Sequence, residues 1–372
     1  MQPSVHRPAV SRLDRRRLLG LLGAGAFASA TAGHLARAAG TATNRRLVFD
    51  DSPPGAGDLF EHVVESERLF EHSPLGLPSR DEAAVPKLRV HSGDDASGHF
   101  RDFGGGVLDF TPDDLTRWSE DVGTHVLDCV RNGPDVGFSR LGAAAFGGVR
   151  LEVLFARALG NTWGSTRVLV EARGAAWWFT VAQLRRHGAF LATSMNGRPL
   201  GEGHGAPLRL VVPGAFACAA LKDVGEIRVI EQGAAWTPAM LEMQGDLAAR
   251  GAVRDGEAPG PAIGIPFSTL PARAEVDERR LNLLGISWGD GSAVVGLEMR
   301  LVSGDRTTPW QRIREFESPA TRPAGSGFAT WRHDLSTPGP GVWSLELRSL
   351  SALSARPGDA TAIGVVRSLR IG

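Results

Sequence analysis

An α+β domain followed by a β-sandwich is the fold class that the sequence predicts, and three observations predict it. The first part of the chain mixes segments with helical and strand-like periodicity. A connector rich in glycine, alanine and proline, residues 250–266, then interrupts the pattern. Beyond it, residues 275–372 contain short alternating runs with no helix signal, which is typical of a sandwich, and we expect an Ig-like one. At 372 residues the chain is long enough for two cores.

The same observations divide the chain into five segments. They are an export signal at 1–38, an N-terminal extension at 39–80, the α+β domain at 81–250, a linker at 251–274 and the sandwich at 275–372. The formal net charge is zero, and we find no polybasic face outside the signal, so we expect no nucleic-acid partner.

The first 38 residues resemble an export signal. Six arginines and one aspartate give this segment a net charge of +5. Arg15 and Arg16 precede an apolar stretch, and Ala-Arg-Ala at 36–38 fits a cleavage site of small residues. The twin arginine indicates the Tat pathway, with an ordinary Sec signal or a basic disordered tail as the alternatives. We expect a periplasmic protein, and no membrane span after signal cleavage because the apolar stretch is too short.

Helices and strands of the α+β domain follow from local patterns. Thr111 as N-cap, Pro112 in the first turn and two acidic residues after it predict a helix start. Alternation and periodicity predict the other elements. These are a short helix within 58–70, strands at 124–130, 167–172 and 208–214, and helices at 148–159 and 180–188.

In the sandwich, we expect Trp288, Trp310 and Trp331 in the core.

The chain has only two cysteines, Cys129 and Cys218. In an oxidising compartment two thiols can form a disulfide, which is one interpretation of the pair, and Cys129 as a buried small apolar residue is another. Cys129 also ends a predicted strand, in LDCVRNG, where a thiolate could ligate a metal. The sequence contains no CxxCH and no CxxC motif, so we expect neither attached haem nor a zinc ribbon.

The stretch MNGRPLGEGHGAPLRLVVPG, residues 195–214, combines five glycines with His204 and Arg209. Glycines permit close approach of the backbone to a ligand, and an arginine at the start of a strand suggests that the ligand is anionic. Lys222 follows thirteen residues after Arg209, in a chain with two lysines and 39 arginines. An exposed strand arginine, a turn histidine and a surface lysine are the alternative interpretations.

Three stretches together resemble the sulfite oxidase family of molybdopterin enzymes. They are MNGRPLGEGHGAPLRLVVPG, TPDDLTRWSEDVGTHVLDCVRNG and LLGISWGDGSAVVGLEMRL. The resemblance covers essentially the whole chain after the signal. It implies a Mo-molybdopterin cofactor, a mixed α/β molybdopterin-binding domain at 81–250 and a dimerisation-type sandwich.

The resemblance also implies roles for individual residues. It makes Cys129 the metal ligand and a catalytic residue. Arg131 is a second catalytic candidate, because this arginine or another could compensate for cations that the family has and this chain lacks. It places His204 at the pterin edge, and Arg209 and Lys222 at the phosphate. Asn132 and Asn196 are further candidates for cofactor contact, although both precede a glycine and are equally typical of turns.

The departures from the family concern the substrate. Leu247 stands where the family has a catalytic tyrosine, and the chain has no tyrosine. Pro134 replaces an arginine after the cysteine, and Asp223 replaces a tryptophan after Lys222. Glu71 and His72 stand near the place of the family's arginine-asparagine-histidine motif.

The sequence thus predicts an exported molybdenum oxidoreductase, similar to sulfite dehydrogenases, that performs oxygen-atom transfer on a small oxyanion-type substrate. With no haem motif in the chain, electrons must pass to an external acceptor such as a c-type cytochrome. The resemblance implies a homodimer. The alternative is a degenerate, non-catalytic family member that acts as a binding or assembly module.

Overall fold

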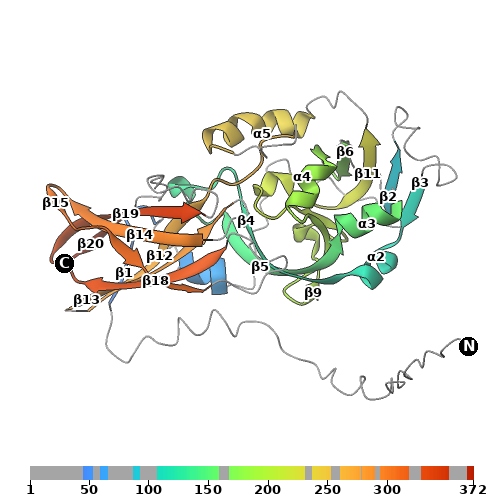
Figure 1. The fold of residues 1–372 in the computed structure, drawn as a ribbon. Helices are drawn as coiled ribbons and strands as arrows, with labels where there is room; N and C mark the ends of the chain where they lie inside the picture. The colour runs from blue at the N-terminus through green and yellow to red at the C-terminus, as the bar shows by residue number, and fades with distance from the viewer. Residues whose placement is uncertain are drawn as a thin grey trace, which may run out of the picture.

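The computed structural model describes most of the chain after residue 44 and resolves it into two parts (Figure 1). The described residues are 45–52, 59–65, 87–92, 107–158, 167–230, 237–252, 260–277, 279–289, 294–317, 328–351 and 367–372. The predicted export signal, Glu71 and His72 lie outside them. Among the described helices, none is long and apolar enough to cross a bilayer.

The first part is built on two sheets. Its strands are β2 (Leu88–Ser92), β3 (Val107–Phe110), β4 (Glu120–Asp128), β5 (Leu141–Arg150), β6 (Arg167–Ala172), β7 (Ala175–Thr180), β8 (Phe190–Met195), β9 (Arg198–Pro199), β10 (Arg209–Val211) and β11 (Val224–Ile230). One sheet has the order β3-β2-β11-β6-β7, in which β2 and β11 are parallel. The other is antiparallel, with the order β10-β8-β5-β4 and with β9 paired to β8.

Short helices connect these strands. They are η1 (Glu61–Glu65), α2 (Pro112–Trp118), η2 (Pro134–Val136), α3 (Leu151–Ala158), α4 (Val181–Arg186), η3 (Glu202–His204), η4 (Ala217–Ala219) and α5 (Pro238–Ala249). The predicted start of α2 is confirmed, because Thr111 and Asp114 form a reciprocal capping box. The helix predicted at 148–159 begins only at Leu151, since the residues before it pair with β8 as part of β5.

The antiparallel sheet β10-β8-β5-β4 is buried on both faces. Val126 of β4 packs into the main apolar core, and its neighbour Leu127 packs into a separate cluster with Phe146 and Phe190. Because a slip of one residue would exchange these two faces, the register of β4 is strongly specified. The fold therefore fixes the point at which this strand delivers Cys129.

The second part consists of two antiparallel sheets. Its strands are β12 (Ser268–Val276), β13 (Arg280–Trp288), β14 (Val294–Ser303), β15 (Arg306–Thr307), β16 (Gln311–Ile313), β17 (Glu315–Glu317), β18 (Ala329–Ser336), β19 (Gly341–Ser351) and β20 (Arg367–Ile371). The short strand β1 (Arg45–Leu47) from the N-terminal extension pairs with β12. The sheet orders are β1-β12-β13-β18-β17 and β15-β14-β19-β20, with β16 paired to β14. Leucines from both sheets, including Leu283 and Leu345, share one core.

The three sandwich tryptophans have different environments. Trp331 is fully buried and Trp288 is 3% exposed. The prediction for Trp310 is wrong: it is only partly buried, and the guanidinium groups of Arg300 and Arg348 lie 4.7 and 4.4 Å from its ring centroid. Cation–π contacts on an outward sheet face account for this position.

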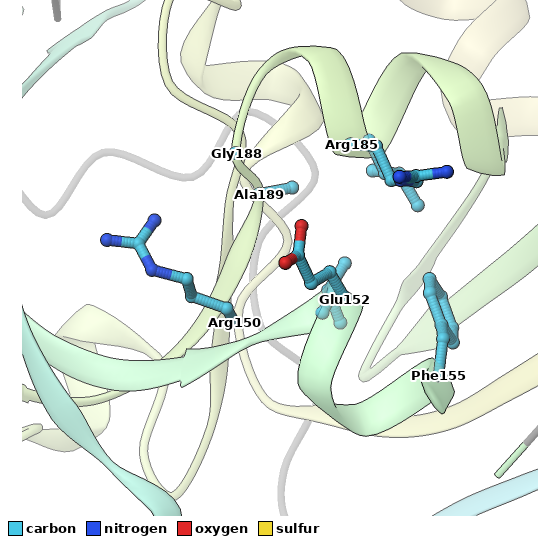
Figure 2. Close-up of a pocket in the computed structure, with 8 residues that line it drawn as sticks. Arg150, Glu152, Phe155, Arg185, Gly188 and Ala189 are labelled. Carbon is cyan, nitrogen blue, oxygen red and sulfur yellow. The ribbon is translucent and has the colours of Figure 1, made fainter. Parts of the chain in front are cut away.

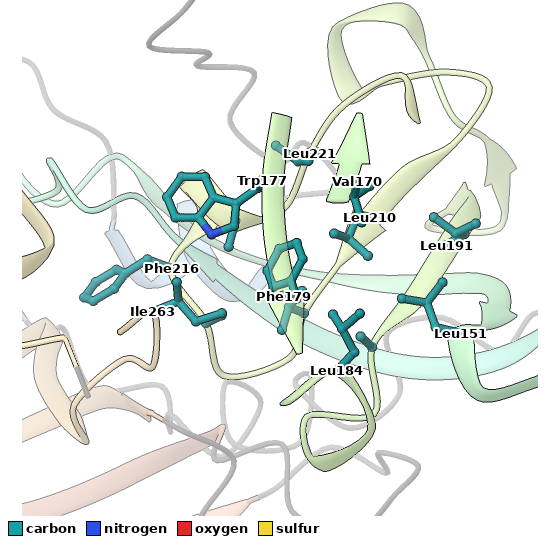
Figure 3. Close-up of a cluster of buried hydrophobic side chains, with 14 of the residues drawn as sticks. Leu151, Val170, Trp177, Phe179, Leu184, Leu191, Leu210, Phe216, Leu221 and Ile263 are labelled. Carbon is teal, nitrogen blue, oxygen red and sulfur yellow. The ribbon is translucent and has the colours of Figure 1, made fainter. Parts of the chain in front are cut away.

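One apolar core joins the two parts. Trp177, Phe179 and Leu210 belong to it in the first part, as Figure 3 shows. Ile286 and Trp288 of β13 belong to the same cluster. In Figure 1, α5 lies over the junction of the two parts. The sandwich therefore packs directly against the domain that carries Cys129.

Candidate cofactor site

Cys129 is the first residue after β4 and lies in a closed loop. Its side chain is 4% exposed. Its backbone N–H donates to the Arg140 carbonyl at 3.0 Å, and its carbonyl accepts the Asn132 N–H at 2.8 Å. Burial raises the pKa of the Cys129 thiol, and the nearby charges of Arg140 and Arg131 oppose that shift. The loop thus presents a fixed sulfur, which a bound metal would hold as thiolate.

The two cysteines are free thiols, so the disulfide interpretation is not what the structure shows. Cys218 lies on η4, in the connection that follows β10. Burial raises the pKa of Cys218 to about 12, and charge on Cys129 adds to the increase. Arg250 contacts both the Asp128 carboxylate and the Phe216 ring, which places the Cys129 loop beside the chain segment that joins Arg209 to Lys222.

Arg209 is a buried cation with few partners. Arg209 is only 2% exposed, and burial lowers the pKa of its guanidinium to about 10. Nη1 donates a long hydrogen bond of 3.5 Å to the His204 carbonyl, and the buried Nε has no hydrogen-bond partner. Within the described part of the chain, no carboxylate pairs with Arg209. A buried, uncompensated arginine is costly, and an anionic ligand would offset that cost.

Lys222 lies directly beside Arg209. The two residues face each other as an antiparallel bridge, and Leu210 N–H donates to the Leu221 carbonyl at 2.8 Å. Lys222 is 9% exposed, and its Nζ donates to the Gly203 carbonyl at 2.7 Å. The fold thus brings two buried cations together next to the glycine-rich segment.

Gly205 shows why this segment needs glycine. Its φ is +97°, a conformation that side chains rarely adopt. A Cβ atom at this position would lie 2.8 Å from both Cα and Cβ of Lys222. The segment therefore approaches the lysine more closely than any other residue type would permit.

Arg173 is a third cation at this site, and the sequence did not point to it. It lies in the turn between β6 and β7, and its backbone N–H donates to the Asp223 carbonyl at 3.1 Å. Its Nε is 3.0 Å from the Asp223 carboxylate, and its Nη1 is 3.6 Å from Glu202. Asp223 directly follows Lys222, so Arg173 reaches the same place from another sheet. We call Arg173, Arg209 and Lys222, together with the neighbouring His204, the cation cluster.

A known family matches the part of the chain that carries this site. Residues 104–236 match the family described as the oxidoreductase molybdopterin binding domain. This range contains Cys129 and the entire cation cluster. The match supports the resemblance of this part of the chain to the sulfite oxidase family of molybdopterin oxidoreductases.

A solved structure has a similar fold. The sulfane dehydrogenase SoxCD from Paracoccus pantotrophus is 18% identical, with a TM-score of 0.53, over 77% of this chain and 78% of that chain. A search of curated proteins finds no match. The structural likeness at this identity concerns the fold.

The residues present fit molybdopterin. The phosphate of molybdopterin is an anion that could pair with Arg209, whose Nε has no hydrogen-bond partner. The glycine segment allows the backbone to approach a flat ring system closely. Among the described residues, no group of three or more histidine, cysteine or acidic side chains could hold a metal ion. The protein thus offers a metal one soft ligand, Cys129, and the cofactor's own dithiolene would supply further sulfur.

The remaining predicted residues make contacts within the protein. Arg131 pairs with Asp246 at 2.6 Å on α5. Asn132 is buried, donating to Asp128 at 3.2 Å and accepting from the Arg140 N–H at 3.1 Å.

Asn196 forms the hairpin turn between β8 and β9. Its φ is +50°, and its side-chain oxygen accepts the Ala145 N–H at 3.0 Å. These contacts match the turn interpretation that the sequence left open for both asparagines.

The departures from the family also have defined positions. Leu247 is 4% exposed and packs in the main core through α5. Pro134 begins η2 in the Cys129 loop. Asp223 has a φ of +59° and engages Arg173.

Arg140 was not predicted from the sequence. Its carbonyl accepts the Cys129 N–H, and the residue forms no ion pair with the residues that the structure describes.

A separate pocket of about 440 Å³ lies between α3 and α4 (Figure 2). Arg150, Glu152 and Arg185 line it together with apolar residues, and none of the predicted site residues does. Arg150 forms an ion pair of 2.5 Å with Glu120. This pocket is distinct from the candidate cofactor site.

Proposed function

We propose that this chain is an exported molybdopterin-dependent oxidoreductase, similar to sulfite dehydrogenases, that performs oxygen-atom transfer on a small substrate. The observation that carries the proposal is Arg209, a buried cation whose Nε has no partner and which faces Lys222 beside a glycine segment. Cofactor phosphate is the ligand that this arrangement fits. When bound, the cofactor supplies the redox and oxygen-transfer chemistry.

The chain's own residues would bind and orient that cofactor. Arg209 and Lys222 hold the phosphate, and Arg173, paired with Asp223, fixes the backbone beside Lys222. His204 contacts the pterin edge. Cys129 provides the protein sulfur to the metal, from a loop whose backbone hydrogen bonds fix its position.

Two arginines beside Cys129 favour an anionic substrate. Arg140 and Arg131 both act electrostatically on the thiol. Arg131 is already neutralised by Asp246, whereas Arg140 is not paired in the described chain. Arg140 is therefore our candidate for the cation that replaces the family arginine lost at Pro134. The structural neighbour is a sulfane dehydrogenase, which supports a small sulfur compound such as sulfite as the substrate.

Export, electron transfer and assembly complete the proposal. The twin arginine at Arg15 and Arg16 supports Tat export to the periplasm. The chain has no CxxCH motif, which supports an external acceptor such as a c-type cytochrome. The two sheets that share a core support an Ig-like sandwich. The homodimer rests on the resemblance to the family, whose sandwich is a dimerisation domain.

The test is to produce the full chain, signal included, in a host that makes the cofactor. We expect molybdenum by elemental analysis, and sulfite-dependent reduction of ferricyanide or cytochrome c. Molybdenum without sulfite turnover would support an oxidoreductase whose substrate is a compound other than sulfite. Protein free of molybdenum would refute the proposal.

A second candidate is a non-catalytic module that keeps the fold. The observation that favours it is Leu247, which is buried in the core where the family has a catalytic tyrosine. Protein that lacks both molybdenum and turnover would support this candidate.

A further inference from the structure

Asp128 is the residue before Cys129, and its carboxylate is completely buried. Three side chains donate to it. The Trp288 indole N–H lies 3.0 Å away, Arg250 Nη2 3.1 Å away and Asn132 Nδ2 3.2 Å away. A buried carboxylate is tolerated where its oxygens are satisfied in this way. Asp128 thus anchors the end of β4 to residues far away in the sequence.

Arg250 holds the other side of the cysteine. While Nη2 contacts Asp128, Nη1 donates to the carbonyls of Val130, at 3.2 Å, and of Asn132. The guanidinium also lies over the Phe216 ring, 5.3 Å from its centroid, in the segment that leads to Cys218. One planar group thus bonds residues on both sides of Cys129, a geometry that the fork of an arginine provides and a lysine does not.

α5 makes a second contact with the same loop. Arg250 is its C-cap, and Asp246, one turn earlier, pairs with Arg131 at 2.6 Å. The loop residues at positions 128, 130, 131 and 132 are all engaged by α5 or its cap. Cys129, between them, is left without a side-chain bond to this helix.

We infer that Arg250, together with Trp288, positions the Cys129 loop through Asp128, so that the sandwich and α5 complete the metal-ligand site. The metal-ligand role of Cys129 rests on the proposed function, whereas the positioning of the loop does not. Arg250 and Trp288 lie outside residues 104–236, the range that matches the family domain. That domain alone therefore does not contain the groups that fix its cysteine.

The test uses full-length, cofactor-free protein from a host that cannot make the cofactor. The rate of alkylation by iodoacetamide is measured for Cys129 and Cys218 by peptide mass spectrometry. In Arg250→Met we expect the ratio of the Cys129 rate to the Cys218 rate to rise about tenfold, because local opening of the loop loses charge-assisted hydrogen bonds. A general loss of stability exposes both thiols through global unfolding and raises both rates together, whereas local opening of the loop raises the Cys129 rate with little change in the Cys218 rate.

Three further variants sharpen the test. Arg250→Lys keeps the charge without the fork, and we expect an intermediate ratio. Trp288→Phe removes one N–H and keeps most of the packing, and we expect a smaller rise of a few fold. Arg300→Met is the matched control, since Arg300 is a half-buried arginine that is paired to Glu346 at 2.6 Å in the sandwich, and its ratio stays at the wild-type value.

An unchanged ratio in folded Arg250→Met protein overturns the inference. If that variant does not fold, an unchanged ratio in Trp288→Phe overturns it. In protein loaded with the cofactor, we also expect the sulfur-to-molybdenum charge-transfer band to shift in Arg250→Lys. Protein that never binds molybdenum refutes the proposed function. The alkylation assay needs no molybdenum, so the thiol rates still decide the loop inference in that case.

Discussion

Replacing Arg209 by methionine has opposite effects on the empty and the loaded protein if the residue exists to bind an anion. In the cofactor-free chain, the guanidinium is 2% exposed, with one long hydrogen bond to His204 and a buried Nε without a partner. Burial lowers the pKa of Arg209 to about 10. A lowering of that size corresponds to roughly 3 kcal/mol of unfavourable burial.

Methionine removes this charge and keeps most of the apolar stem. We therefore expect Arg209→Met to raise the free energy of unfolding of the cofactor-free protein by about 1–3 kcal/mol. The same change removes charge-assisted hydrogen bonds to the phosphate, so we expect at least tenfold weaker cofactor retention. Urea unfolding of the empty protein and molybdenum content after gel filtration measure the two effects.

Arg367 provides the matched control. It is also 2% exposed, but it forms hydrogen bonds of 2.6 to 3.0 Å with the Asp51 carboxylate. Removing one partner of such a buried pair leaves an uncompensated charge, so Arg367→Met is expected to destabilise the protein by about 3–5 kcal/mol. If Arg209→Met destabilises the empty protein to a similar extent, Arg209 is a structural residue and the reasoning fails.

Three other predictions concern the glycine segment, the substrate and pH. Gly205→Ala should lower stability by roughly 1–3 kcal/mol because of its positive φ, and should reduce molybdenum content; normal loading would argue against a tight cradle. Arg140→Met should raise the KM for sulfite about tenfold with molybdenum content unchanged, and an unchanged KM would remove Arg140 from substrate binding. Burial lowers the pKa of His125 in the folded protein below its value in the unfolded chain. The unfolded chain therefore binds a proton more readily, and the free energy of unfolding falls as pH drops from 7 to 5. His125→Gln should flatten this slope in urea titrations, and an equally steep slope would contradict the assignment.

Local signals in the sequence predicted several elements correctly. The capping box and proline at the start of α2, the alternation of β6 and the apolar run at β10 each act within a few residues. The placement of Cys129 after a strand follows in the same way. The glycine-rich stretch and its cations were also visible, because their chemistry is written in consecutive residues.

Other features depend on contacts between distant residues. Arg250 bonds the Cys129 loop across more than a hundred residues, and Arg131 meets Asp246 over a similar separation. Arg173 joins the cation cluster only because β6 and β11 are neighbours in one sheet. The pairing of β1 with the distant β12 is of the same kind. A single sequence does not encode such partners in any local pattern.

α5 was missed although its start signals are present. Thr237 caps the helix, and Pro238 occupies its first turn. Gly245 in its middle and its weak amphipathic pattern obscured the rest. This helix carries Leu247 in the core, Asp246 against Arg131, and Arg250 at its end.

The central claim is that Cys129 ligates the molybdenum of a cofactor whose phosphate is bound by the buried cations Arg209 and Lys222. The most direct measurement is molybdenum content of the full-length protein and its Cys129→Ser variant, purified side by side from a cofactor-producing host, with the charge-transfer band recorded for both. We predict near-stoichiometric molybdenum and a sulfur-to-metal band in the wild type, and loss of the band in the variant. An identical spectrum and equal molybdenum in the two proteins would contradict the account.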